Sequence, residues 1–163
     1  DLPIVGTSLG PYEVDEFVMK PVKTAPGVFS NVWVQDILER STGLYTAHVV
    51  ENRSAEVLIG GVVSFCPPNS IVFSDDWGGY ARLDSHGYRH FTVNHSAREM
   101  SREEEIDGET VEIHVNTLEA LHSVIRRRLA NKARRNVARL QLVLKEFAYR
   151  RSGRPLLAPL KVQ

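Results

Sequence analysis

The sequence predicts an α/β protein of one domain, with a mixed central sheet flanked by helices. Three runs of β-forming residues with a hairpin signal lie in the first third of the chain, and two amphipathic helical patterns lie near its end. Between them, helical and strand patterns alternate. Strands followed by helix, strand, helix, strand and helices indicate this architecture, although pattern alone also permits other α/β arrangements.

The first third is expected to form three strands. The run 12–18 follows a Gly-Pro turn, and the run 31–38 (NVWVQDIL) is rich in β-branched and aromatic residues. The run 44–50 (LYTAHVV) comes after a Thr-Gly pair, which favours a hairpin with the preceding strand.

The next segment predicts a helix and a buried strand. Ser54 can cap a helix over 55–65, and the Pro-Pro-Asn run after it ends that helix. Residues 70–74 are apolar and short, which is consistent with a strand buried on both faces.

Shorter elements are expected after this strand. Residues 78–79 (GG) mark a turn, 80–85 a short helix, 88–93 a further strand, and the acidic stretch 101–110 a solvated loop.

Two amphipathic helices are expected next, each with apolar residues at i, i+3, i+7 and i+10 or i+11. Their apolar positions are Leu118, Leu121, Ile125 and Leu129 in the first helix, and Val137, Leu140, Leu144 and Phe147 in the second. The proline-containing segment 153–163 is expected to be irregular.

The composition is that of an ordinary globular domain, with 163 residues, 42% hydrophobic and 25% charged. No apolar stretch approaches the roughly 20 residues of a membrane span, so no membrane partner is expected. The single cysteine, Cys66, fits a reducing intracellular compartment. Because the chain begins with Asp rather than Met, we expect a fragment or a processed protein.

The charges are segregated along the chain although they sum to zero. Residues 126–154 contain eleven Lys or Arg and one acid, Glu146, whereas acids concentrate in 103–109. A basic cluster of this kind suits nucleic acid. It is also what a solvated helix face with i, i+4 partners looks like.

Three carboxylates lie where a two-metal nuclease would need them. Asp15 is in the first strand, Asp75 ends the apolar strand, and Glu119 is near the start of a packed helix. Two Mg²⁺ or Mn²⁺ ions held by such oxygens can activate a hydroxyl and stabilise a leaving oxygen in phosphodiester chemistry. The plainer alternatives are an edge-strand charge for Asp15, a turn or cap residue for Asp75 and a solvated helix residue for Glu119.

The helical phase places further residues beside Glu119. His122 and Arg126 share its face, whereas Leu118, Leu121, Ile125 and Leu129 form the apolar stripe. Arg126 could contact a phosphate bidentately.

Read together, a series of short motifs resembles the insertion-sequence DDE transposases, especially the group that includes the Merlin elements. The resemblance covers about residues 12 to 151. The matching motifs are VDE at 14–16, VWV at 32–34, ER at 39–40, VENRSAE at 50–56, SDDWGGY at 74–80, GYRH at 87–90, VNHS at 93–96, HVNTLE at 114–119 and EFAYR at 146–150.

The resemblance implies an RNase H-like fold and metal-dependent DNA cleavage and strand transfer. Its catalytic and metal-binding triad would be Asp15, Asp75 and Glu119, with Asp75 preferred over Asp76 because the family's Asp stands two residues before a Trp. Other family positions, with roles in the pocket or in DNA contact, would be Asn94, His95, His114, Asn116 and His122.

The organisation and partners follow from the same resemblance. Residues 1–11 would be a lead-in, 12–151 the catalytic domain and 152–163 a tail. Arg126, Arg127, Lys132 and Arg135 would bind DNA, both transposon ends and target, within a homo-oligomer. The location would be the cytoplasm or nucleoid in a bacterium and the nucleus in a eukaryote.

Five departures from the family pattern lie near the triad. Ala120 and Leu121 replace a Gly and an aromatic residue, which are packing changes. His122 stands where the family has Trp, Arg126 where it typically has Lys, and Asp36 where it has a small residue. They keep open a second hypothesis, a catalytically lapsed, transposase-derived DNA-binding or assembly module. A simple nuclease or resolvase on the same fold is a third.

Overall fold

Five strands form one mixed sheet in the computed structural model of the chain, which describes residues 5–133 and 135–153. These strands are β1 (Tyr12–Ala25), β2 (Val28–Glu39), β3 (Tyr45–Val50), β4 (Ile71–Asp75) and β5 (Arg89–Val93). The sheet order is β3-β2-β1-β4-β5; β1 pairs antiparallel with β2 and parallel with β4. The predicted mixed α/β architecture is therefore confirmed.

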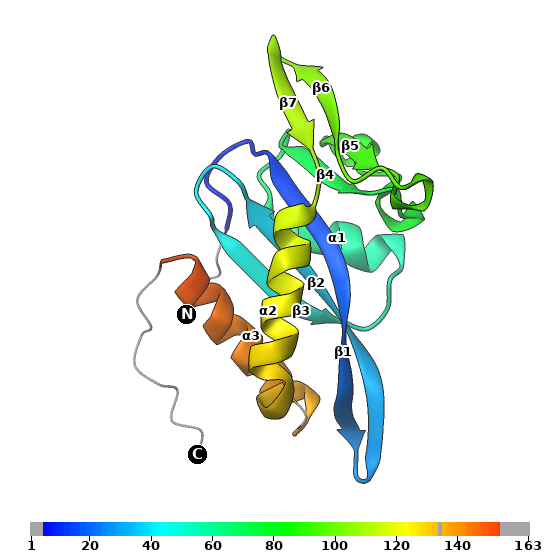
Figure 1. The fold of residues 1–163 in the computed structure, drawn as a ribbon, viewed down its shortest axis with the longest axis vertical. Coiled ribbons are helices and arrows are strands. Elements are labelled where there is room, and N and C mark those ends of the chain that lie inside the picture. Colours follow the sequence, from blue (N-terminus) through cyan, green and yellow to red (C-terminus); the bar gives the residue numbers. More distant parts are fainter. Residues whose placement is uncertain (1–4, 134, 154–163) are drawn as a thin grey trace.

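Helices cover both faces of the sheet (Figure 1). The first helix, α1 (Ala55–Phe65), packs on one face, while α2 (Asn116–Ala133) and α3 (Val137–Arg151) pack on the other. Side chains of β1 point alternately to the two faces of the sheet, so this strand contributes to both cores. Val14 packs in the core with α1, and Phe17 packs in the core with α2 and α3. Among the described residues, no helix is long and apolar enough to span a membrane.

The predicted helix 55–65 has the expected bounds and cap. The Ser54 hydroxyl accepts a hydrogen bond from the Val57 amide, 3.4 Å away. Gly61 allows close approach to the sheet, because a Cβ at this position would collide with the Gln35 side-chain amide.

The prediction of a solvated loop over 101–110 is wrong. A hairpin, β6 (Arg102–Ile106) and β7 (Glu109–Ile113), occupies this segment. Asp107 and Gly108 form its two-residue turn with φ of 53° and 82°, as an Asp-Gly hairpin turn requires. Buried Ile106 and Ile113 attach the hairpin to the sheet, and the acidic side chains do not prevent pairing.

Two other predictions need correction. The strands predicted over 12–18 and 31–38 are longer, because β1 and β2 continue past the rest of the sheet as a two-stranded ribbon (Figure 1). The helix predicted over 80–85 is replaced by 3₁₀ turns at Gly78–Tyr80 and Asp84–His86. The predicted irregular tail lies outside the described residues beyond Gly153.

Candidate active site

Strands β1 and β4 place two carboxylates near each other at the sheet's centre. Their paired positions are Tyr12 with Val72 and Glu13 with Phe73, so Asp15 and Asp75 each lie two residues past the last pair. The Asp15 side chain is 15% exposed. Burial, together with the negative charges of Asp36 and Asp75, raises the pKa of Asp15 to about 9. Such a shift is typical of an acid that lacks a counter-ion.

Asp75 has a free oxygen inside the protein. Burial raises its pKa, and the nearby His95 and Arg53 partly offset that rise. Within the described part of the chain, its buried Oδ1 has no hydrogen-bond partner. A buried carboxylate oxygen without a donor is costly and is available to a hard cation.

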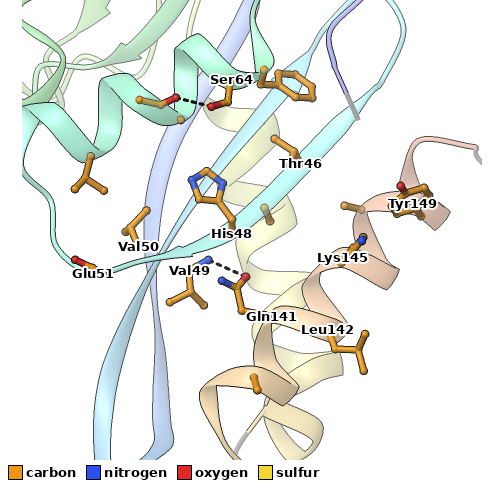
Figure 2. Close-up of a pocket in the computed structure, with 17 residues that line it drawn as sticks. Thr46, His48, Val49, Val50, Glu51, Ser64, Gln141, Leu142, Lys145 and Tyr149 are labelled. Atoms are coloured by element: carbon orange, nitrogen blue, oxygen red, sulfur yellow. Dashed lines mark hydrogen bonds between the residues drawn. The ribbon is translucent and has the colours of Figure 1, made fainter. Parts of the chain in front are cut away.

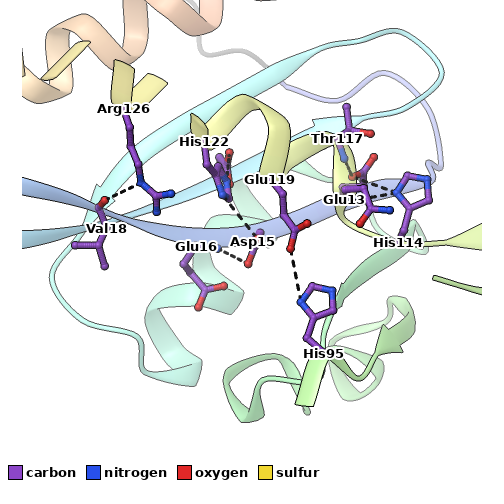
Figure 3. Close-up of polar contacts among 12 residues, drawn as sticks. Glu13, Asp15, Glu16, Val18, His95, His114, Thr117, Glu119, His122 and Arg126 are labelled. Carbon is purple, nitrogen blue, oxygen red and sulfur yellow. Dashed lines mark hydrogen bonds and ion pairs between the residues drawn. The ribbon is translucent and has the colours of Figure 1, made fainter. Parts of the chain in front are cut away.

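Glu119 reaches the same region from the first turn of α2. Its Oε1 lies 3.6 Å from Nδ1 of His95, and its side chain is 39% exposed (Figure 3). Because His95 also acts electrostatically on Asp75, this imidazole links the second and third carboxylates. Asn94 holds the turn that presents His95, since its Oδ1 accepts from the Ala97 amide at 3.0 Å.

His122 is a buried link to Asp15. Its Nε2 lies 2.8 Å from Oδ2 of Asp36, and its Nδ1 lies 3.9 Å from Oδ2 of Asp15 (Figure 3). Asp36 also accepts a hydrogen bond from the Tyr45 hydroxyl at 2.9 Å, and the imidazole stacks on Phe17. Burial raises the pKa of Asp36, and His122 moderates that rise. Two of the departures from the family pattern, Asp36 and His122, are therefore partners in one buried pair.

A buried Glu13 fixes the start of α2. It accepts from Nε of Arg40 at 3.0 Å and from the Thr117 amide at 3.1 Å. Arg40 in turn donates to the carbonyls of Glu112 and His114. This network ties β1 to the segment that carries Glu119. Arg40 belongs to the matching motif at 39–40, whereas Glu13 was not singled out. The signal in the sequence was that Glu13 is one of three acids in the first strand, with Asp15 and Glu16.

The other predicted residues lie along β1 or on the exposed surface of the chain. His114 Nδ1 lies 3.8 Å from Glu13 and accepts from the amide of Asn116, the first residue of α2. Arg126 donates to the Val18 carbonyl at 3.3 Å and so runs along β1 (Figure 3). The remaining predicted DNA-binding residues are exposed: Arg127, Lys132 and Arg135.

The donors present fit a hard cation. Three carboxylates from three elements offer oxygen ligands, including the unpartnered oxygen of Asp75. In the described residues, no three His, Cys, Asp or Glu side chains already form a cluster able to hold a metal ion. The residue types suit magnesium or manganese, and the side chains are not preassembled into a cage.

A separate groove lies at the β3 edge of the sheet. It has a volume of about 880 Å³ and runs along β3 between α1 and α3 (Figure 2). Its lining includes His48, Val57 and Leu142 and none of the three carboxylates. We therefore separate this groove from the candidate active site.

Comparison with known proteins identifies the family. The ISXO2-like transposase domain matches residues 22–152, a span that includes Asp75 and Glu119 and begins after Asp15. No curated protein matches. A chain in a cryo-electron microscopy structure of the simian T-cell lymphotropic virus intasome, in complex with the PP2A regulatory subunit B56 gamma, is similar in fold, with a TM-score of 0.56 and 12% identity. The match covers 100% of this chain and 63% of that chain. Since the domain match spans most of its length, this chain belongs to the ISXO2-like transposase domain family.

Proposed function

We propose that this chain is the RNase H-like catalytic core of a DDE transposase of the group that includes the Merlin elements. In this proposal residues 12–151 are the catalytic domain, preceded by a lead-in and followed by a tail at 152–163. Asp15, Asp75 and Glu119 bind two Mg²⁺ or Mn²⁺ ions. The protein acts on transposon ends and target DNA as a homo-oligomer, in the nucleoid of a bacterium or the nucleus of a eukaryote.

The observation that carries the proposal is the uncompensated charge at the centre of the sheet. Asp15 and Asp75 both have raised pKa values because they are buried. The cationic groups beside them offset this only in part: Nδ1 of His122 lies 3.9 Å from Asp15, and His95 and Arg53 act on Asp75. Divalent cations supply the missing charge and, once bound, activate the attacking hydroxyl and stabilise the leaving oxygen.

The chain's own residues would position the reactants. The 3′-hydroxyl of one DNA end attacks a phosphorus atom of the target, an O–P bond forms, and the bond to the target's 3′ oxygen breaks. His95 holds Glu119 toward Asp75. The exposed Arg127, Lys132 and Arg135 contact phosphates without reading sequence.

The Glu13–Arg40 network sets where Glu119 enters. It fixes the first turn of α2 against β1, so that the third carboxylate approaches on a rigid element rather than a loop.

The test is metal-dependent DNA cleavage with a matched pair of variants. Purified protein should nick supercoiled plasmid with Mg²⁺ or Mn²⁺ and not with EDTA. Asp75→Asn should abolish nicking, while Asp76→Asn, at the exposed neighbouring position, should retain it. Calorimetric titration with Mn²⁺ gives a second readout that needs no turnover.

Two results would contradict the proposal. Nicking that survives in Asp75→Asn would remove the residue assignment. Salt-dependent DNA binding without metal binding or cleavage in the wild type would favour the catalytically lapsed module instead.

A further inference from the structure

An arginine is held between two tryptophans beside the candidate active site. The guanidinium carbon of Arg53 lies 4.3 Å from the ring centroid of Trp33 and 4.1 Å from that of Trp77. The three residues come from β2, from the segment before α1 and from the turn after β4. Nothing in the triad explains this cation–π stack.

Hydrogen bonding fixes Arg53 at one atom and leaves its outer amino groups available. Its Nε donates to Oε1 of Glu16 at 3.0 Å, and Tyr80 donates to the other oxygen of Glu16 at 2.7 Å. The Arg53 side chain is 28% exposed. Its two terminal amino groups make no hydrogen bond within the described residues, so they can donate to an anion from solvent.

Trp77 presents an aromatic surface to solvent. It is 42% exposed and belongs to none of the three hydrophobic cores among the described residues. Two neighbours nevertheless hold it in place. Arg53 covers one face of the ring, and Gly79 packs against its edge, because a Cβ added at Gly79 would come within 2.9 Å of the indole nitrogen. A rigid, exposed indole loses little entropy when a flat ligand stacks on it.

The stack adjoins the carboxylates. Trp77 follows Asp75 by two residues, and the charge of Arg53 acts on Asp75. A ligand here would need a planar apolar face for Trp77 and an anionic group for Arg53. A nucleotide has both.

We propose that Trp77 and Arg53 form a subsite for an unpaired DNA nucleotide next to the reacting phosphate. The base stacks on the open face of Trp77, and its phosphate accepts hydrogen bonds from the terminal amino groups of Arg53. The subsite rests on the proposed function, because it assumes that DNA reaches the carboxylates. It goes beyond that function by predicting a preference for DNA with unpaired bases.

The first test measures binding without catalysis. The 163-residue chain is titrated in EDTA with a duplex bearing a short single-stranded overhang that contains 2-aminopurine, and with the blunt duplex. Stacking should quench 2-aminopurine fluorescence. Trp77→Ala should weaken overhang binding about tenfold, since base–aromatic stacking is worth about 1–3 kcal/mol per base, and should leave blunt-duplex binding unchanged.

Three variants make the result specific. Trp77→Phe keeps an aromatic face and should retain most of the quenching. Arg53→Lys keeps the charge but loses the planar donor and should weaken overhang binding. Phe29→Ala removes an aromatic side chain that is 55% exposed at the far ribbon tip, so it should behave as wild type.

The outcomes separate the subsite from the catalytic proposal. Equal losses on overhang and blunt DNA in Trp77→Ala, or no loss on either, would overturn the subsite even when nicking is intact. Quenching that depends on Trp77 in a protein that never nicks DNA would support the subsite and overturn the catalytic proposal. A thermal melt of each variant shows whether Trp77 and Arg53 only brace the fold; a lowered melting temperature with unchanged overhang affinity would also overturn the subsite.

Discussion

Replacing Asp15 by Asn is expected to stabilise the metal-free protein and to remove its stabilisation by Mn²⁺. In the folded state burial and the neighbouring Asp36 and Asp75 raise the pKa of Asp15 to about 9, from an ordinary value of 3.8. A folded pKa above the unfolded one means that the folded state binds more protons, so Asp15 lowers stability progressively as pH rises from about 4 to 9.

The magnitude follows from this pKa difference. At pH 7 the folded protein keeps a proton on Asp15, whereas the unfolded chain has lost it. The loss of stability therefore accumulates over about three pH units, from 3.8 to 7. Each unit corresponds to about 1.4 kcal/mol, which sets an upper limit of about 4 kcal/mol. Because the side chain keeps some solvent contact, the expected gain in Asp15→Asn is about 1–3 kcal/mol.

Urea denaturation between pH 5 and 9, with and without Mn²⁺, measures this effect. The stability difference between Asp15→Asn and wild type should widen with pH in EDTA, and Mn²⁺ should stabilise the wild type but not Asp15→Asn. Asp76→Asn is the matched control and should stay within about 0.5 kcal/mol of wild type. A destabilised Asp15→Asn variant in EDTA, or one that Mn²⁺ still stabilises, would refute the charge-repulsion argument.

Three further predictions concern parts of the fold that support the site. His122→Phe should destabilise by about 3–5 kcal/mol in urea, because it leaves the buried Asp36 carboxylate without its imidazole, and adding Asp36→Leu should recover most of that loss. Burial raises the pKa of Glu39, but the hydrogen bonds that it accepts outweigh burial and lower its pKa. Glu39 therefore stabilises the folded state above about pH 4.5, and this contribution is lost as pH falls. Glu39→Gln should flatten acid unfolding curves below about pH 5. Gly61→Ala should cost about 1–3 kcal/mol because a Cβ there meets a buried side-chain amide, whereas Gly60→Ala, in open space, should stabilise by about 0.5–1 kcal/mol; thermal melts compare the two.

Strong local signals explain which elements were predictable. The helix 55–65 carries its own cap, and the two C-terminal helices carry apolar stripes of helical period, so their identities follow from nearby residues. The hairpin at 102–113 was missed because its acidic composition outweighed the Asp-Gly turn signal at 107–108. Pairing is decided by Ile106 and Ile113, whose burial depends on a sheet edge distant in sequence.

In the candidate site, too, the sequence selected residues but did not predict the contacts between distant ones. Asp15, Asp75 and Glu119 were selected by ordered motifs around them, and as ligands they remain a proposal. Asp36 stands out because the resembled family has a small residue at that position, but its partner lies 86 residues away on α2. No local pattern predicts a contact over that separation.

The sequence by itself determined the α/β class, the helices at 55–65 and near the C-terminus, and the choice of the three acids, because caps, periodicity and motif order are local properties of the chain. Only the tertiary structure decided the electrostatics. It set Asp15 opposite Asp36 in the β1–β2 register, left one oxygen of Asp75 unpartnered, and stacked Arg53 between two tryptophans. Burial and charge proximity arise only when distant segments pack together, and they are what turn three acids into a candidate site.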